Sequence, residues 1–319
     1  MSEQMTTHRF GRTGLQLSRV GLGAGGPSRL GTQQGNGDSQ VEALIACARD
    51  LSINHIDTAR GYGTEATIGR ALQRLGAHDM MIATKVFWHD RDTHRSDTVQ
   101  RDPQELVGEV EASLKDLRRD QIDIFQFHAV LPEDFDEIVE RLLPVALSLR
   151  DQGKIRHIGI TEDPSKDHSQ AMARAAAQCG HFDSLMVQYS ILDQVAEPLG
   201  ITETTFAATR ARDMGVFCMS AARSAFTGLE PLRQTMDRLA DGESTLFETR
   251  IPDGMTPADL AFKFAAAQAG IDVVLVGTGN QAHLRASTAA VLGAPLSSDI
   301  LDWLRQRYGM TDGQLLWQD

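Results

Sequence analysis

The chain has 319 residues, of which 41% are hydrophobic and 23% charged, values typical of a soluble globular protein rather than a disordered, fibrous or membrane one. Its 43 acidic and 31 basic residues give a formal net charge of -12, which argues against general binding to nucleic acid or to anionic lipid. The three cysteines have no C-x-x-C spacing and the N-terminus lacks a signal-peptide pattern, so we expect a cytoplasmic protein with neither a disulfide framework nor a cysteine zinc site.

Short apolar segments alternate with longer amphipathic ones along the whole chain. A hairpin is expected first, over residues 8–17. Strands are then predicted at residues 19–23, 53–56, 80–83, 122–127, 155–160, 185–187, 216–219 and 273–276. Helices are predicted over residues 39–50, 65–75, 103–118, 134–151, 167–178, 199–213, 256–269 and 281–291, with an appended helix over 295–308.

Eight strand–helix units without an obvious linker predict an α/β fold of one domain over residues 1–319, a (β/α)8 TIM barrel rather than an open doubly wound sheet. The hairpin would precede the barrel and the last helix would follow it. Residues 221–254 have weaker periodicity and several glycines and prolines, so we interpret them as a loop insertion near the ligand, after the seventh strand.

Groups capable of acid–base chemistry follow three successive predicted strands. Asp57 and Tyr62 follow the second strand, Lys85 the third and His128 the fourth. A barrel collects such groups at one mouth, so we expect a single active site. Tyrosine has an unperturbed pKa of about 10, and a nearby Lys85 would lower it and make Tyr62 a better general acid. Asp57 would keep Lys85 charged and in place, and His128 could orient the same substrate oxygen.

In this arrangement the chain resembles the aldo-keto reductases, whose Asp, Tyr, Lys and His tetrad matches these four residues in order and context. Short motifs extend the resemblance over nearly the whole chain: Phe10-Gly-Arg-Thr-Gly14, Gly61-Tyr-Gly63, Lys154-Ile-Arg-His-Ile-Gly159 and Gly277-Thr278. The resemblance implies NAD(P)H-dependent reduction of an aldehyde or ketone to an alcohol. The nicotinamide would deliver a hydride, Tyr62 would protonate the oxygen, and no metal would take part.

The cofactor contacts that the resemblance implies depart from the family pattern. Thr161 and Glu162 stand in place of a Ser-Asn pair, and Glu162 can only accept hydrogen bonds while ionised. Met186 aligns with the family's Gln, and Gln188 is a possible substitute on the same strand face. Phosphate is expected on backbone amides after the eighth strand. The cofactor-binding residues predicted are Thr161, Glu162, Gln188, Cys218, Met219, Ser220, Arg223, Gly277, Thr278, Gly279 and His283.

Cofactor identity and the substrate pocket are less defined. Gly277 and His283 replace the basic residues usual for NADP, and Arg223 and Arg285 are alternative sources of positive charge. The usual preference of the family favours NADP slightly over NAD. Trp88 is expected to form a wall of the substrate pocket, and Arg29 is either solvated or a substrate anchor. The polar residues that follow Trp88 are interpreted as a solvated loop rather than a metal site; they include His89, Asp90, Asp92, His94 and Asp97.

Two other functions fit the same residues. One is an NAD-dependent dehydrogenase of a sugar or secondary alcohol that works mainly in the oxidative direction. The other is a non-catalytic, cofactor-binding regulatory subunit resembling potassium-channel β subunits. A small carbonyl compound or alcohol is the expected ligand, with no nucleic-acid or membrane partner, and no residue pattern specifies the substrate or the oligomeric state.

Overall fold

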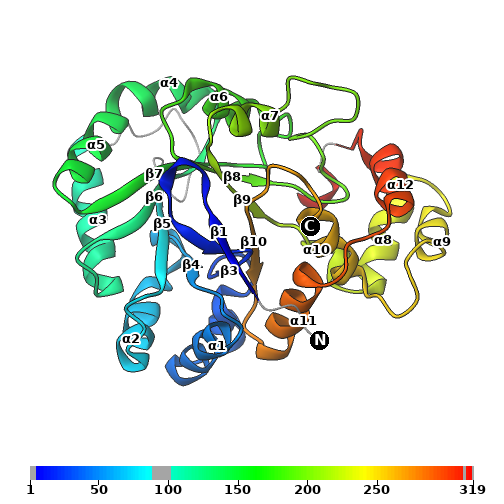
Figure 1. Cartoon of the computed structure of the whole chain (residues 1–319), viewed down its shortest axis with the longest axis horizontal. Coiled ribbons are helices and arrows are strands. Elements are labelled where there is room, and N and C mark those ends of the chain that lie inside the picture. Colours follow the sequence, from blue (N-terminus) through cyan, green and yellow to red (C-terminus); the bar gives the residue numbers. More distant parts are fainter. Residues whose placement is uncertain (1–4, 88–101, 312–313, 318–319) are drawn as a thin grey trace.

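Eight parallel strands close into a barrel in the computed structural model, which describes residues 5–87, 102–311 and 314–317 (Figure 1). This confirms the predicted (β/α)8 fold. Around the barrel the strands are β3 (Val20–Gly23), β4 (His55–Asp57), β5 (Met81–Phe87), β6 (Ile122–Val130), β7 (Ile155–Glu162), β8 (Ser184–Gln188), β9 (Gly215–Met219) and β10 (Val273–Gly277), and β10 pairs with β3. Because the strands are parallel, their C-terminal ends meet at one mouth.

Helices surround the barrel, and most begin where the sequence predicts them. They are α1 (Asp38–Asp50), α2 (Glu65–Leu75), α3 (Pro103–Leu117), α4 (Phe135–Glu137), α5 (Leu143–Asp151), α6 (Ala171–Cys179), α7 (Thr205–Ala211), α10 (Pro257–Ala266) and α11 (Gln281–Leu292). At the start of α3, the Asp102 side chain accepts a hydrogen bond from the backbone N–H of Gln104 at 2.9 Å, and Pro103 opens the first turn.

Three predicted helices differ in the structure. The helix predicted over 134–151 is divided into α4, a π-helical segment at Ile138–Leu142 and α5. Pro144 follows this segment and lacks the N–H that a regular helix needs, which accounts for the wider turn. α6 begins only at Ala171 because Gln170 has a left-handed backbone with φ of 51°. α7 is shorter than the predicted helix over 199–213.

The predicted hairpin forms and closes the end of the barrel opposite the mouth. Strands β1 (Thr7–Arg9) and β2 (Gln16–Ser18) pair antiparallel with His8 opposite Leu17. The Phe10 ring is fully buried, with its centroid 4.5 Å from that of Phe217 on β9. Figure 1 shows this hairpin, in dark blue, across the strands. Burial of such a ring stabilises the fold by about 1.5–3 kcal/mol.

The segment over 221–254 is helical, whereas the sequence analysis expected a loop insertion. It contains a 3-10 helix (Ser224–Thr227), α8 (Leu229–Leu239) and α9 (Glu243–Glu248). The appended helix α12 (Ser298–Tyr308) is present as predicted and lies near α8 and α9 (Figure 1). Its Tyr308 hydroxyl donates a hydrogen bond to the buried Glu243 of α9 at 2.6 Å. The inserted helices are therefore anchored by the appended helix.

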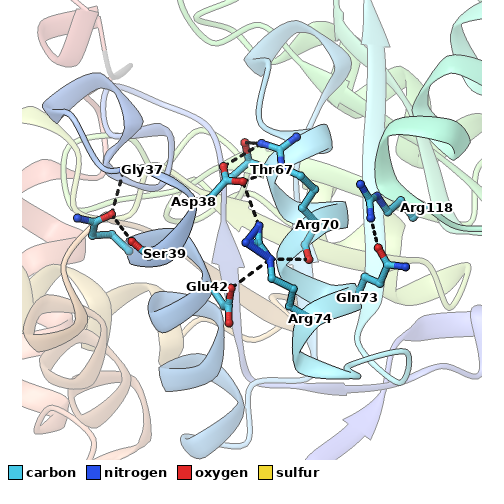
Figure 2. Close-up of polar contacts among 10 residues, drawn as sticks. Gly37, Asp38, Ser39, Glu42, Thr67, Arg70, Gln73, Arg74 and Arg118 are labelled. Atoms are coloured by element: carbon cyan, nitrogen blue, oxygen red, sulfur yellow. Dashed lines mark hydrogen bonds and ion pairs between the residues drawn. The ribbon is translucent and has the colours of Figure 1, made fainter.

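Ion pairs join the outer helices α1 and α2 (Figure 2). Asp38, in the first turn of α1, accepts hydrogen bonds from Arg70 Nε at 2.7 Å and from Arg74 Nη2 at 3.0 Å. The hydrogen bond from Arg70 contributes most to lowering the pKa of Asp38 to about 2. These side chains are partly exposed, so water and salt screen the pairs.

Among the described helices, none is long and apolar enough to cross a membrane.

Candidate active site

A cavity of about 580 Å³ opens at the mouth of the barrel. Its wall includes the C-terminal ends of several strands, and Met186 and Leu275 from the barrel interior also line it. All four residues of the predicted tetrad line this cavity: Asp57, Tyr62, Lys85 and His128. The structure therefore brings together the side chains that the sequence analysis grouped.

Asp57 and Lys85 form a buried ion pair. Asp57 ends β4 and is 4% exposed, and Lys85 lies within β5 and is 0% exposed. Lys85 Nζ donates to Asp57 Oδ2 at 2.7 Å and to the Thr58 carbonyl oxygen at 2.7 Å. Burial alone would lower the pKa of Lys85, but the charge of Asp57 and contact with Tyr62 outweigh burial and raise this pKa. Lys85 is therefore held as an ammonium ion.

Tyr62 lies on a 3-10 helix (Arg60–Tyr62) beside this pair. Its hydroxyl is 3.4 Å from His128 Nε2, and Lys85 Nζ is 4.9 Å from the centroid of its ring. Burial raises the pKa of Tyr62, and the positive charge of Lys85 opposes that rise. The net direction is upward, whereas the sequence analysis expected a lowered pKa. Only the contribution of Lys85 has the expected sign, because burial disfavours the phenolate more strongly.

The position of Tyr62 depends on a close approach by Gly25, in the loop after β3. A Cβ atom at position 25 would lie only 2.4 Å from the Tyr62 ring, so any larger residue there would displace the ring or the loop. The sequence analysis did not single out Gly25. A glycine in a Gly-rich loop gives no signal of its partner until the barrel brings the loop onto Tyr62.

Phe87 is a further cavity residue that the sequence analysis missed. Its ring stacks on the His128 imidazole with centroids 3.9 Å apart and an interplanar angle of 19°. Phe87 lies two residues after Lys85 on β5, so both side chains are on the same strand face. That spacing was the available signal, but the strand was predicted to end at residue 83. Trp88, which was chosen instead, and the polar residues after it lie outside the described residues.

Thr161 and Glu162 end β7 and line the cavity. Thr161 Oγ1 accepts a hydrogen bond from the Ala129 N–H at 2.7 Å. Glu162 Oε1 accepts one from the Gln188 N–H at 2.6 Å, and its Oε2 has no hydrogen-bond partner among the described residues. Burial raises the pKa of Glu162 well above its ordinary range, which favours the protonated form, and a protonated carboxyl group can donate a hydrogen bond as well as accept one. The sequence analysis considered it only as an ionised acceptor.

The remaining predicted contacts divide into two groups. Met219, Ser220, Arg223 and Gly277 line the cavity. Six predicted residues are absent from the described cavity wall: Arg29, Gln188, Cys218, Thr278, Gly279 and His283. Gln188 Nε2 instead donates to Asp193 Oδ2 at 2.6 Å, and Met186 on the same strand face lines the cavity.

Packing explains why the other five lie elsewhere. Cys218 is fully buried in the main core, where its Sγ donates to the Tyr189 carbonyl oxygen at 3.4 Å. Gly279 packs so tightly on Gly31 that a Cβ would lie 2.3 Å from the Gly31 Cα. Thr278 Oγ1 accepts from the Asn280 N–H at 3.1 Å, and His283 is exposed on α11. Arg29 is half-buried, and its charge acts on Tyr62.

Within residues 5–87, 102–311 and 314–317, no three His, Cys, Asp or Glu side chains converge as a group that could hold a metal ion. The ionisable groups that line the described cavity are a phenol, an ammonium, an imidazole, a guanidinium and three carboxyl groups.

Known proteins with similar sequences are oxidoreductases by name. The chain is 34% identical over 207 residues to the NADH-specific methylglyoxal reductase of Escherichia coli, covering 59% of this chain and 60% of the relative. It is 32% identical over 161 residues to the L-galactose dehydrogenase of Arabidopsis thaliana, covering 49% and 48%. The matches thus span less than two-thirds of either relative.

A solved structure shares the fold over nearly the whole chain. The holo form of an aldo-keto reductase from Bacillus halodurans superposes with a TM-score of 0.70 at 22% identity, covering 95% of this chain and 96% of the other. The sequence profile of the Aldo/keto reductase family matches residues 19–306. With its barrel, hairpin and match over most of its length, the chain belongs to the aldo/keto reductase family, a family of oxidoreductases.

Proposed function

We propose that the protein reduces an aldehyde or ketone to an alcohol with NAD(P)H, and that Tyr62 is the general acid. The observation that carries the proposal is the contact set in one cavity: a buried Lys85 paired with Asp57 at 2.7 Å, and a Tyr62 hydroxyl 3.4 Å from His128 Nε2. When bound, the cofactor supplies a hydride to the carbonyl carbon.

The raised pKa of Tyr62 suits a proton donor, because the phenol keeps its proton until a stronger base forms beside it. The developing alkoxide is such a base. Lys85 then stabilises the phenolate that remains on Tyr62, and Asp57 keeps Lys85 charged without direct contact with the substrate. His128 orients the substrate oxygen, and the Phe87 ring holds the imidazole plane by stacking.

The cavity residues also fit a nicotinamide cofactor. Glu162 and Thr161 would bind the carboxamide, because a buried carboxyl oxygen without a partner can both donate to and accept from an amide. Met186, Met219 and Ser220 would contact the ring, and Arg223 and the Gly277 backbone would bind phosphate. The N-terminal amides of α11 contribute less than expected, since the Asn280 side chain already accepts from Ala282 N–H at 2.8 Å.

The choice between NAD and NADP rests on two opposing observations. Members of the family usually prefer NADP. Against it, residues 277–284 contain no Lys or Arg, and the Escherichia coli relative is named NADH-specific. Arg285 Nη2 lies 4.0 Å from Asp50 Oδ2, and both side chains are exposed, so this ion pair is weak and leaves Arg285 available to a phosphate. Titration of both reduced cofactors by quenching of tryptophan fluorescence decides the preference.

The Tyr62→Phe variant tests the proposed acid. We expect kcat with a panel of aldehydes to fall by about 10²- to 10⁴-fold, because general acid catalysis is lost, while the Kd of the reduced cofactor changes little. Wild-type turnover in this variant would overturn the assignment of Tyr62. If neither NADH nor NADPH bound to the wild-type protein, the reductase proposal itself would be wrong.

A second candidate is an oxidative dehydrogenase of a sugar or secondary alcohol. The resemblance to the enzyme named L-galactose dehydrogenase and the missing basic residues at 277 and 283 favour it. The same groups would act in reverse, with Tyr62 receiving the hydroxyl proton. Comparison of kcat/KM for alcohol oxidation and carbonyl reduction at one pH distinguishes the two directions.

A further inference from the structure

Glu162 is a buried acid whose hydrogen bonding is incomplete. It is 2% exposed and lines the cavity at the end of β7. Its Oε1 accepts a hydrogen bond from the Gln188 N–H, but its Oε2 has no partner among the described residues. A buried carboxyl oxygen without a partner is costly, and far more so when it is charged. Because Glu162 lines the cavity, a polar ligand bound there would supply the missing partner.

Burial and the acidic groups on neighbouring elements oppose the ionisation of Glu162, whereas the hydrogen bond from the Gln188 N–H favours it. Asp163 and Asp167 follow it in the chain, and Asp193 follows β8; all three are acidic. Cys218 on β9 is a buried thiol whose pKa is raised to about 12, so it carries no charge at neutral pH. On the tetrad side of the cavity, the Lys85 ammonium is already paired with Asp57. The positive charge of a cation bound in this pocket would therefore favour the ionised form of Glu162.

The two redox forms of a nicotinamide differ by one positive charge on the ring, which the oxidised form carries and the reduced form lacks. We propose that Glu162 distinguishes these forms: it binds the reduced cofactor as a neutral acid and the oxidised cofactor as a carboxylate, and it releases its proton to solvent when the oxidised cofactor binds. This inference rests on the proposed function, because it requires the nicotinamide to occupy the cavity beside β7.

Thermodynamic linkage gives the sign of the effect. A ligand that prefers the ionised acid binds more tightly as the pH rises through the range between the bound and free pKa values of Glu162. The affinity for oxidised cofactor should therefore increase with pH, by up to about tenfold per pH unit for one linked proton. The affinity for reduced cofactor should not increase. At higher pH the site would then retain oxidised cofactor and favour the oxidative direction.

The test compares the dissociation constants of NAD⁺ and NADH for the full chain over about pH 6 to 9, together with calorimetry in two buffers of different ionisation enthalpy. For the wild type we expect the Kd of NAD⁺ to fall with pH and up to about one proton to be released, with neither effect for NADH. In Glu162→Gln, which preserves size and hydrogen bonding, both constants should be independent of pH in this range.

Asp163→Asn is the matched control, because it removes a neighbouring acid that also lines the cavity. It should keep the difference in slope between the two cofactors. Equal slopes for NAD⁺ and NADH in the wild type would overturn the inference without any variant, as would an unchanged NAD⁺ slope in Glu162→Gln. If neither NAD⁺ and NADH nor NADP⁺ and NADPH bound at any pH, the proposed function, on which the inference depends, would be overturned instead.

Discussion

His55 and Asp57 are two buried ionisable groups that lie two residues apart on β4, on the same strand face. Their surroundings in the barrel differ in charge. Asp57, at the mouth, is paired with Lys85 at 2.7 Å. His55, at the closed end, packs against Phe217 with ring centroids 5.9 Å apart, and burial lowers its pKa to about 3. On β4, the charge of Asp57 at the mouth is therefore balanced by Lys85, whereas burial at the closed end favours an uncharged His55.

The largest effect is expected from breaking the charged pair at the mouth. Lys85→Met leaves Asp57 buried without its partner, which should cost about 3–5 kcal/mol of unfolding free energy. It should also lower kcat by about 10²-fold or more, because the phenolate of Tyr62 loses its counter-charge. Urea unfolding and steady-state reduction of an aldehyde measure the two effects.

The double variant Asp57→Asn with Lys85→Met separates these effects. Removal of both charges should restore most of the unfolding free energy, since replacing a buried pair by neutral groups is often nearly neutral. Activity should stay low, because the ammonium is still missing. Recovery of activity together with stability would contradict the role of Lys85 at Tyr62. It would mean that the Asp57–Lys85 pair has a structural role only.

A substitution at the closed end should have the opposite profile. Phe10→Ala empties the space between the hairpin and Phe217 and should cost about 3–5 kcal/mol of unfolding free energy. The kcat of the folded fraction should stay near the wild-type value, since Phe10 is absent from the described cavity wall. Thermal unfolding and turnover measured well below the midpoint check both points. A large loss of kcat would show that the two ends of the barrel are coupled.

The sequence predicted the barrel and the meeting of the tetrad because both follow from local order: apolar strands alternate with helices, and strand ends gather at one mouth. Contacts that depend on packing between distant segments were not predictable in this way. Gly25 on Tyr62 and Gly279 on Gly31 are close approaches between loops, which no local pattern records.

The cofactor side of the site was harder to predict for a related reason. Cys218 and Met219 are neighbours in sequence, but alternation on β9 turns Cys218 into the core and leaves Met219 at the cavity. The protonation state of Glu162 depends on burial and on acids from other elements, so the sequence alone suggested an ionised group. In both cases a residue's role is set by the strand face or by neighbours that only the fold supplies.

Near neutral pH, the smallest expected effect is the pH dependence of stability at the closed end. Burial, with a smaller contribution from the nearby His8, lowers the pKa of His55 to about 3. Because this folded pKa lies below the unfolded value of about 6.5, neutral His55 contributes stability that is fully present above about pH 6.5 and is lost as the pH falls toward 3. The loss should approach about 1.4 kcal/mol per pH unit in that window.

The variant His55→Gln isolates this contribution from those of the many carboxyl groups that also titrate. The difference in unfolding free energy between wild type and variant, measured with urea at several pH values, should shrink as the pH falls below about 6.5. The Gln side chain can form a hydrogen bond with the Ser18 hydroxyl, because Ser18 Oγ lies 3.4 Å from Nδ1 of His55. A difference in unfolding free energy that stays constant down to pH near 4 would mean that the closed end tolerates a charged imidazole. The two ends of β4 would then differ only in that Asp57 has Lys85 as a partner.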